Sequence, residues 1–142
     1  MENNPQKQSP EILGGTSFEN GVNIPSSRFA YERATRENLQ IVLPRANELQ
    51  IDIDNEDAEE VFTVLMNHLV PAFIGFSSVI KNPSKSGAPG KFHITVALNQ
   101  DVTPLERIAL QAILGSDRKR ELLSFIELAN GDKTPTLFLE KK

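Results

Sequence analysis

The sequence contains no cysteine. Disulfide bonds, thiolate zinc sites and cysteine nucleophiles are therefore excluded, and the composition fits a reducing compartment. No apolar run approaches the roughly 20 residues that a membrane-spanning helix needs. The first residues, MENNPQKQSPEI, also lack the basic start and apolar core of a secretory signal. We expect a cytoplasmic protein that does not contact a membrane.

The charge balance is mildly acidic, with a formal net charge of −4 over 142 residues. A protein that coats duplex DNA needs a broad basic surface, so this class is disfavoured. Charge is also uneven along the chain. Acidic residues crowd positions 52–60, whereas lysines frame the loop at 81–91 and a basic cluster lies at 118–120. Any contact with phosphate groups should therefore be local.

The chain divides into three segments by composition. Residues 1–27 are rich in Asn, Gln, Ser, Pro and Gly, and they hold too few large apolar side chains to offset the entropy of ordering, so we expect a mobile arm. Residues 28–47 form an ambiguous lead-in, in which positions 39–43 could be an edge strand that Pro44 ends. Residues 48–142 are expected to form one α+β domain.

Periodicity and capping signals predict the elements of this domain. Alternating apolar and polar residues indicate strands at 48–54 and 92–98. Thr103-Pro104-Leu105-Glu106 is a capping box with Pro at the first helical position, so it opens a helix that runs to about 114. The other expected elements are a helix at 56–69, a strand at 73–80, a loop at 81–90, an extra helix from 116 or 117 to Gly131 and a last strand at 135–140.

The order β-α-β-β-α(α)-β is the split βαβ arrangement of ferredoxin-like and RRM-like domains. It predicts a four-stranded antiparallel sheet with helices on one face and an extra helix before the last strand. In this topology the first and third strands are antiparallel neighbours, so the end of one lies beside the start of the other. Strand parity then places Asp52, Asp54 and His93 together at one end of the opposite, open face.

These three side chains are candidate catalytic residues. Carboxylates at i and i+2 on a strand, here Asp52 and Asp54, can share one hard cation, so we expect Mg²⁺ or Mn²⁺ as cofactor. Such a cation binds substrate phosphates, while His93 can contact or position a phosphate or transfer a proton. Each feature alone also has a structural explanation, as a helix cap, a surface charge or a surface histidine. Their convergence at one end of the sheet favours a joint site.

The loop that precedes His93 adds candidate phosphate ligands. It joins the second and third strands at the same end of the sheet, and its hydroxyls, ammonium groups and backbone N–H groups suit a phosphate. The candidates for nucleotide or phosphate binding are Ser84, Lys85, Ser86, Lys91 and His93. A plain hairpin connection is the structural alternative for the same loop.

The series Ile51-Asp52-Ile53-Asp54, followed by a Ser86-Gly87-x-x-Gly90 loop that leads into His93, resembles the first two motifs of the archaeo-eukaryotic primase superfamily. The resemblance implies that Asp52 and Asp54 are metal ligands, and that His93 and the Ser86 loop contact the phosphates of an incoming nucleotide. It implies nucleotidyl transfer on a primed or single-stranded nucleic acid. The third acidic motif has Asp117 and Asp132 as candidates, and a protein partner would supply the second module that a primase normally has.

Three other functions deserve comparison with this one. The His93-Ile94-Thr95 sequence has the form of a two-histidine phosphoesterase motif, but the chain offers no second copy, so this class is excluded. A non-catalytic nucleic-acid binder would present stacking aromatics on its open sheet, where the central strands instead place Asp, His and Thr. A small protein-interaction module, such as a phage accessory factor, remains open as an alternative.

Overall fold

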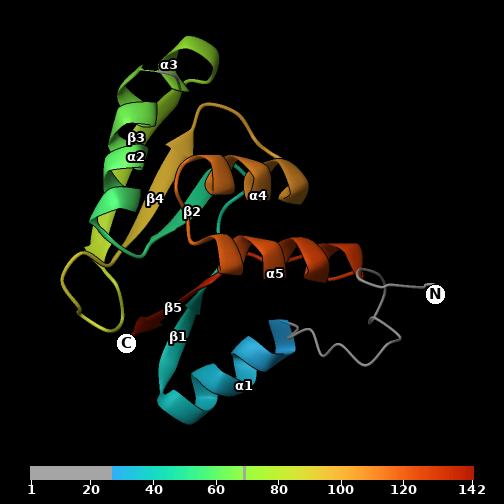
Figure 1. Cartoon of the computed structure of the whole chain (residues 1–142). Helices are drawn as coiled ribbons and strands as arrows, with labels where there is room; N and C mark the ends of the chain where they lie inside the picture. The colour runs from blue at the N-terminus through green and yellow to red at the C-terminus, as the bar shows by residue number, and fades with distance from the viewer. Residues whose placement is uncertain (1–26, 69) are drawn as a thin grey trace.

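The computed structural model describes residues 27–68 and 70–142, and within them the fold class is α+β, as expected (Figure 1). The predicted mobile arm lies outside the described residues, except for Ser27, at which helix α1 (Ser27–Glu37) begins. Strand β1 (Leu39–Val42) follows, so the segment with an ambiguous pattern forms a helix and a short strand. No helix in the described ranges combines the length and the apolar character that crossing a bilayer requires.

Most elements of the main domain lie where the periodicity predicts them. The Thr103 capping box is formed, because its hydroxyl accepts from the Glu106 N–H and the Glu106 carboxylate accepts from the Thr103 N–H. Helix α5 has Asp117 as its N-cap, and Gly131 follows its end with a φ of 98°. The remaining bounds are β2 (Glu48–Ile53), α2 (Glu56–His68), α3 (Val70–Phe73), β3 (Phe76–Pro83), β4 (Phe92–Leu98), α4 (Pro104–Ile113), α5 (Arg118–Ala129) and β5 (Phe138–Lys141).

The second strand of the prediction is displaced. We expected it at residues 73–80, but β3 begins at Phe76, because residues 70–73 form the short helix α3. Pro71 falls in the first turn of that helix, where its missing N–H leaves no hydrogen bond unmade. Proline therefore does not end the helical region here, and the strand starts and ends three residues later than predicted.

The predicted four-stranded sheet is wrong. The structure contains a three-stranded sheet in the order β2-β4-β3 and a separate two-stranded ribbon in which β5 pairs with β1 (Figure 1). All three pairings are antiparallel, and Leu39 of β1 lies opposite Lys141 of β5. The last strand thus pairs with the lead-in segment and leaves the β2 edge, where ferredoxin-like topology would place it.

Polar groups from α4 and α5 occupy the β2 edge instead. The backbone groups of Glu48, Gln50 and Asp52 point away from β4, and each is hydrogen-bonded. The Glu48 carbonyl accepts from Arg107 Nε (2.8 Å). The Gln50 N–H donates to Gln111 Oε1 (2.7 Å), and the Gln50 carbonyl accepts from Arg120 Nη1 (2.7 Å). The Asp52 N–H donates to Ser116 Oγ (3.0 Å), and the Asp52 carbonyl accepts from the backbone N–H of Asp117 (2.8 Å). Because buried backbone groups must be paired, these four side chains and the Asp117 N–H replace the neighbouring strand. We call them the β2 edge cap.

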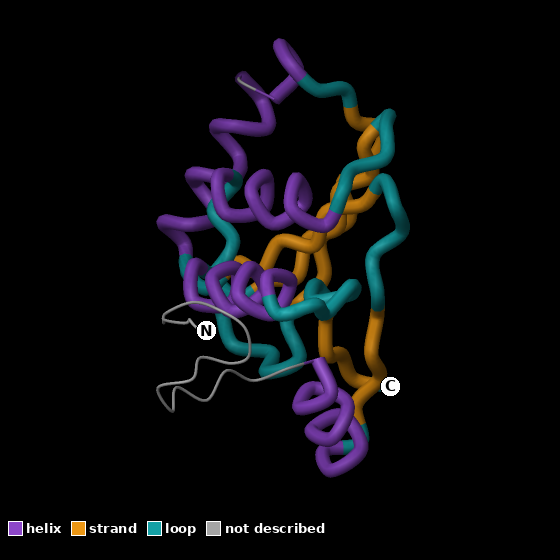
Figure 2. The backbone as a smooth tube through the Cα atoms, turned by 90° about the vertical axis from the view of Figure 1, so that its right-hand side faces the viewer, coloured by secondary structure: helices purple, strands orange, loops and turns teal. Residues whose placement is uncertain are grey.

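The helical face of the sheet holds the core, as the alternation predicts. Leu49, Ile51 and Ile53 of β2 are fully buried, and they pack with Ile94 and Val96 of β4. Helix α2 contributes Phe62 and Met66, and Leu114 follows α4. In Figure 2 the helices of the upper part of the molecule lie on one side of the strands. Burying a large aliphatic side chain contributes about 1.5–3 kcal/mol, so this layer dominates the stability of the domain.

The opposite face of the sheet is only partly open, which corrects a second expectation, since Ile80 of β3 is exposed there but the end with the candidate site is covered. Gln50 is 1% exposed and His93 is 8% exposed, although both lie on the polar face. The Gln50 side chain donates from Nε2 to the Val42 carbonyl of β1, and His93 packs on β5. The β1–β5 ribbon therefore covers the end of this face where the candidate site lies.

The outer edge of β3 pairs with no strand among the described residues. Ser84 N–H donates to the Lys91 carbonyl, so the backbone groups of alternate residues, including Val79 and Lys81, point outward. The pairing with β4 shifts register between Phe76 and Ser78, which marks a β-bulge, and the strand ends at Pro83.

Candidate functional site

Asp52 and His93 lie directly opposite each other in the β2–β4 register, as the sequence predicts. Their side chains share the polar face, and His93 Nε2 is 3.8 Å from Asp52 Oδ1. This distance is too long for a hydrogen bond. The two strands thus bring a carboxylate and an imidazole together without any distortion of the sheet.

The His93 ring is held from its other side by β5. Its Nδ1 is 3.0 Å from Glu140 Oε2, and the ring stacks on Phe138 with centroids 4.0 Å apart and planes 2° from parallel. Each nitrogen therefore faces a carboxylate, and the ring is nearly inaccessible. His93 therefore lies buried between Asp52 and Glu140, whereas we had expected it on an open face.

Asp52 remains partly accessible, with 30% of its side chain exposed. Its pKa is raised above the ordinary value, first because burial penalises the charged form. Arg120 and His93 oppose this shift, while the carboxylates of Asp117 and Asp54 add to it. A carboxyl group that is half-desolvated beside other acids favours proton or cation binding, so Asp52 is the chemically most distinctive group of the cluster.

Asp54 lies just beyond β2 and is bound by an ammonium group. Lys91 Nζ is 2.6 Å from Asp54 Oδ1, in an exposed ion pair. The pKa of Lys91 is raised, chiefly by the hydrogen bond to Asp54, with smaller contributions from Asp52 and Asp117. Lys91 therefore neutralises part of the acidic cluster.

Of the two candidates for a third acid, Asp117 joins this end of the sheet. Its backbone N–H donates to the Asp52 carbonyl, and its carboxylate caps α5 by accepting from Lys119 N–H. Asp132 follows the other end of α5, where its charge acts on Glu127. The α4–α5 corner, rather than the loop after α5, completes the acidic cluster.

The donor set determines what kind of cation could bind. In residues 27–68 and 70–142, no group of three or more His, Asp and Glu side chains is arranged to hold a metal ion. Asp54 is also engaged by Lys91, and both nitrogens of His93 face carboxylates. These residues do not fit a resident metal. Mg²⁺ commonly uses one or two carboxylates together with substrate phosphates and water, so a cation that arrives with its own phosphate ligands is compatible with Asp52 and Asp54.

The loop residues separate into two groups. Ser84 and Lys85 line a hollow of about 310 Å³ that also involves Glu140 and Lys141, whereas Lys91 points to Asp54. Ser84 Oγ and Ser86 Oγ are 2.9 Å apart, and Ser86 Oγ accepts from the Ala88 N–H. The two hydroxyls therefore stabilise the loop itself, and Ser84 and Lys85 share a hollow with Glu140, which contacts His93.

Sequence reasoning missed Phe138, Glu140 and Arg120 as parts of this site. The first two lie on β5, which the predicted topology placed beside β2. Arg120 was noticed only as one member of a basic cluster, although its guanidinium acts on both Gln50 and Asp52. No periodic signal distinguishes such residues, because their role depends on how the ribbon crosses the sheet.

Glu127, beside Asp132, yields a prediction about stability and pH. Its pKa is raised to about 8, first by burial and then by Asp132. The folded state therefore holds a proton that the unfolded chain has released, and stability falls as the pH rises from the unfolded pKa through the folded pKa. We expect Glu127→Gln to match the wild type at about pH 4 and to exceed it by about 1–2 kcal/mol at about pH 9, a range discounted for a half-buried group.

Urea unfolding at several pH values measures this difference, with the exposed Glu60→Gln as the matched control. A wild-type and Glu127→Gln pair with the same pH dependence would contradict the assignment.

Comparison with known proteins adds no relative to these observations. No protein-family model, no curated protein and no solved structure matches the chain at the significance that a relative requires. The function of the chain is therefore argued from its residues.

Proposed function

We propose that the domain handles the phosphate groups of a nucleotide, or of single-stranded or primed nucleic acid, at the end of the sheet where Asp52 meets His93. The carrying observation is the register that sets these two residues opposite each other. The 84–91 loop enters β4 at the same end, and its Ser84 and Lys85 line the adjacent hollow. Carboxylates, a fixed imidazole and a lysine-bearing loop are the groups that phosphate chemistry with a hard cation uses.

In this proposal each residue has a distinct role. Asp52 and Asp54 hold Mg²⁺ or Mn²⁺ that arrives on the phosphates, and the cation, when bound, neutralises phosphate charge. Lys85 and Ser84 contact phosphate oxygens. His93 positions the Asp52 carboxylate and is itself oriented by Glu140. Nucleotidyl transfer is the reaction that a primase-like site would perform, with a protein partner supplying the missing module.

A titration with Mn²⁺ and a nucleoside triphosphate tests the proposal. We expect the wild type to bind the Mn²⁺–nucleotide complex at least about tenfold more tightly than Asp52→Asn/Asp54→Asn, which corresponds to about 1.4 kcal/mol. Paramagnetic broadening of backbone NMR signals should centre on the end of β2 and the start of β4. The matched control is Asp57→Asn/Glu60→Gln, which removes the same charge from exposed positions of α2.

Equal affinity in the Asp52/Asp54 variant and the control would reject the metal-dependent site. If the complex binds, incorporation of nucleotides on a primed template decides whether the domain transfers nucleotides. RNA or DNA binding that the Asp52/Asp54 variant retains without metal would favour a non-catalytic binder. A domain that binds neither nucleotide nor nucleic acid would leave the protein-interaction module as the remaining function.

A further inference from the structure

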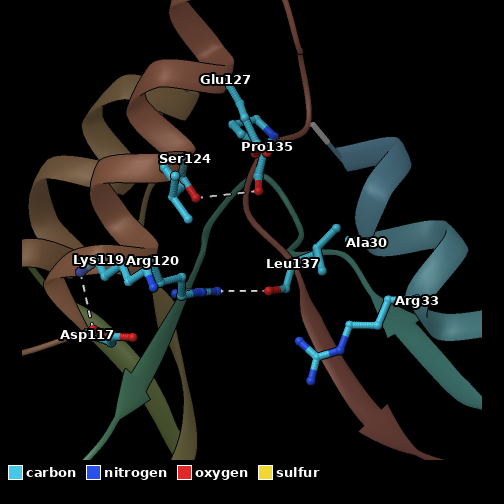
Figure 3. Close-up of a pocket in the computed structure, with 10 residues that line it drawn as sticks. Ala30, Arg33, Asp117, Lys119, Arg120, Ser124, Glu127, Pro135 and Leu137 are labelled. Carbon is cyan, nitrogen blue, oxygen red and sulfur yellow. Dashed lines mark hydrogen bonds between the residues drawn. The ribbon is translucent and has the colours of Figure 1, made fainter. Parts of the chain in front are cut away.

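A second hollow lies between α5, α1 and the segment that leads into β5 (Figure 3). Its volume is about 280 Å³. Cavities for small ligands commonly measure about 300–1,000 Å³, so this one suits a compact molecule. Its apolar wall consists of Ala30, Leu123, Pro135 and Leu137.

Three cationic side chains line the same hollow. Arg33 extends from α1 toward the segment that carries Leu137 (Figure 3), and its Nε donates to Glu37 Oε2 at 3.0 Å. Lys119 is exposed on the first turn of α5. Arg120 is held in place because Nη2 donates to the Leu137 carbonyl at 3.0 Å. Arg33 and Lys119 are therefore the cations with donors to offer a ligand.

The acidic residues of the hollow do not cancel this charge. Burial and Asp132 raise the pKa of Glu127 to about 8, so near neutral pH its carboxyl is largely protonated and acts as a hydrogen-bond donor. Asp117, which caps α5, is the other acid in the wall. Ser124 is buried and donates to the Pro135 carbonyl, so it closes the deep end.

We propose that this hollow binds a small phosphate monoester, with Arg33 and Lys119 contacting the phosphate and the apolar wall contacting the ester group. A dianion with three terminal oxygens suits two cations better than a singly charged carboxylate or a phosphodiester does. The two cations that would contact the ligand, Arg33 and Lys119, have no part in the Asp52 site, although Asp117 and Arg120 border both.

Phenyl phosphate, inorganic phosphate and acetate are suitable probes for an NMR titration of the full chain. We expect saturable shifts of the backbone signals around Arg33, Lys119 and Leu137. Phenyl phosphate should bind at least about fivefold more tightly than inorganic phosphate, because only it uses the apolar wall, and about tenfold more tightly than acetate. Equal affinity for phenyl phosphate and inorganic phosphate would overturn the role of the apolar wall, and acetate binding equally well would overturn the choice of a phosphate.

The variants Arg33→Gln and Lys119→Gln should each lower the affinity for phenyl phosphate at least about fivefold. Lys133 is an exposed cation outside the hollow, so the affinity of Lys133→Gln should stay within about twofold of the wild type. All three positions are partly or fully exposed, so unchanged melting temperatures verify that the variants fold. Equal binding by the wild type and both hollow variants would overturn the proposal. Asp52→Asn/Asp54→Asn should retain phenyl phosphate binding, so failure of the metal-dependent site and failure of this one are distinguishable.

Discussion

Replacing Arg120 with Met is expected to lower the free energy of unfolding by about 3–5 kcal/mol, the cost of leaving a buried charge without its partner. Arg120 Nη1 is 2.6 Å from Glu121 Oε2 and 2.7 Å from the Gln50 carbonyl, and Nη2 reaches the Leu137 carbonyl. Glu121 is 2% exposed. Methionine keeps much of the volume but leaves the Glu121 carboxylate and two backbone carbonyls short of a donor.

Urea unfolding measures this loss, and Arg118→Met is the matched control because Arg118 is exposed on the same helix. We expect the control to change stability by less than about 0.5 kcal/mol. The stability loss of Arg120→Lys should lie between those of Arg120→Met and Arg118→Met, since lysine keeps the charge but cannot donate from two separate terminal nitrogens as the guanidinium does. A loss below about 1 kcal/mol in Arg120→Met would mean that water replaces the guanidinium, and the β2 edge cap would then not depend on it.

Gly115→Ala should destabilise the domain by about 2–4 kcal/mol through two additive causes. Gly115 joins α4 to α5 with a φ of 97°, which costs an alanine about 1–2 kcal/mol. An added Cβ would also lie 2.9 Å from the backbone carbonyl oxygen of Ala58 in α2. A backbone atom inside a helix cannot move aside as a flexible side chain can, so the clash adds to the conformational cost.

Gly131→Ala isolates the first cause, the conformational cost. Gly131 has a φ of 98°, nearly identical to that of Gly115, but a Cβ there would meet nothing within 4 Å. Its expected loss is the conformational term alone, about 1–2 kcal/mol. Equal losses in the two alanine variants, measured by thermal and urea unfolding, would show that the close approach of the α4–α5 corner to α2 is not tight in solution.

The alternation of apolar residues was enough to predict which side chains of β2 and β4 share a face. A one-residue slip would have moved Ile51 and Ile94 out of the core, so burial fixes the parity of the pairing, and the expected topology placed the end of β2 beside the start of β4. Asp52 and His93 were therefore predicted as neighbours correctly. Local signals also located the Thr103 capping box and the Asp117 cap, since these depend on residues three or fewer positions apart.

The partner of the last strand was not predictable in this way. Whether β5 pairs with β2 or β1 depends on polar groups of the β2 edge cap, such as Gln111 and Ser116, which have no period and look like ordinary helix-surface residues in the sequence. Because the last strand was expected beside β2, the contacts of Phe138 and Glu140 with His93, and the burial of His93 that results, were not predicted. Long-range hydrogen bonds from side chain to backbone decided both outcomes.

The two edges of the three-stranded sheet are closed to a further strand by different means. At β2, the cap leaves no free backbone donor or acceptor at Glu48, Gln50 or Asp52 for another chain. At β3, the bulge near Ser77 bends one end, Pro83 lacks an N–H at the other, and Lys81 adds a charge between them. These features oppose edge-to-edge pairing of neighbouring copies at β3, where Val79 and Ile80 are exposed.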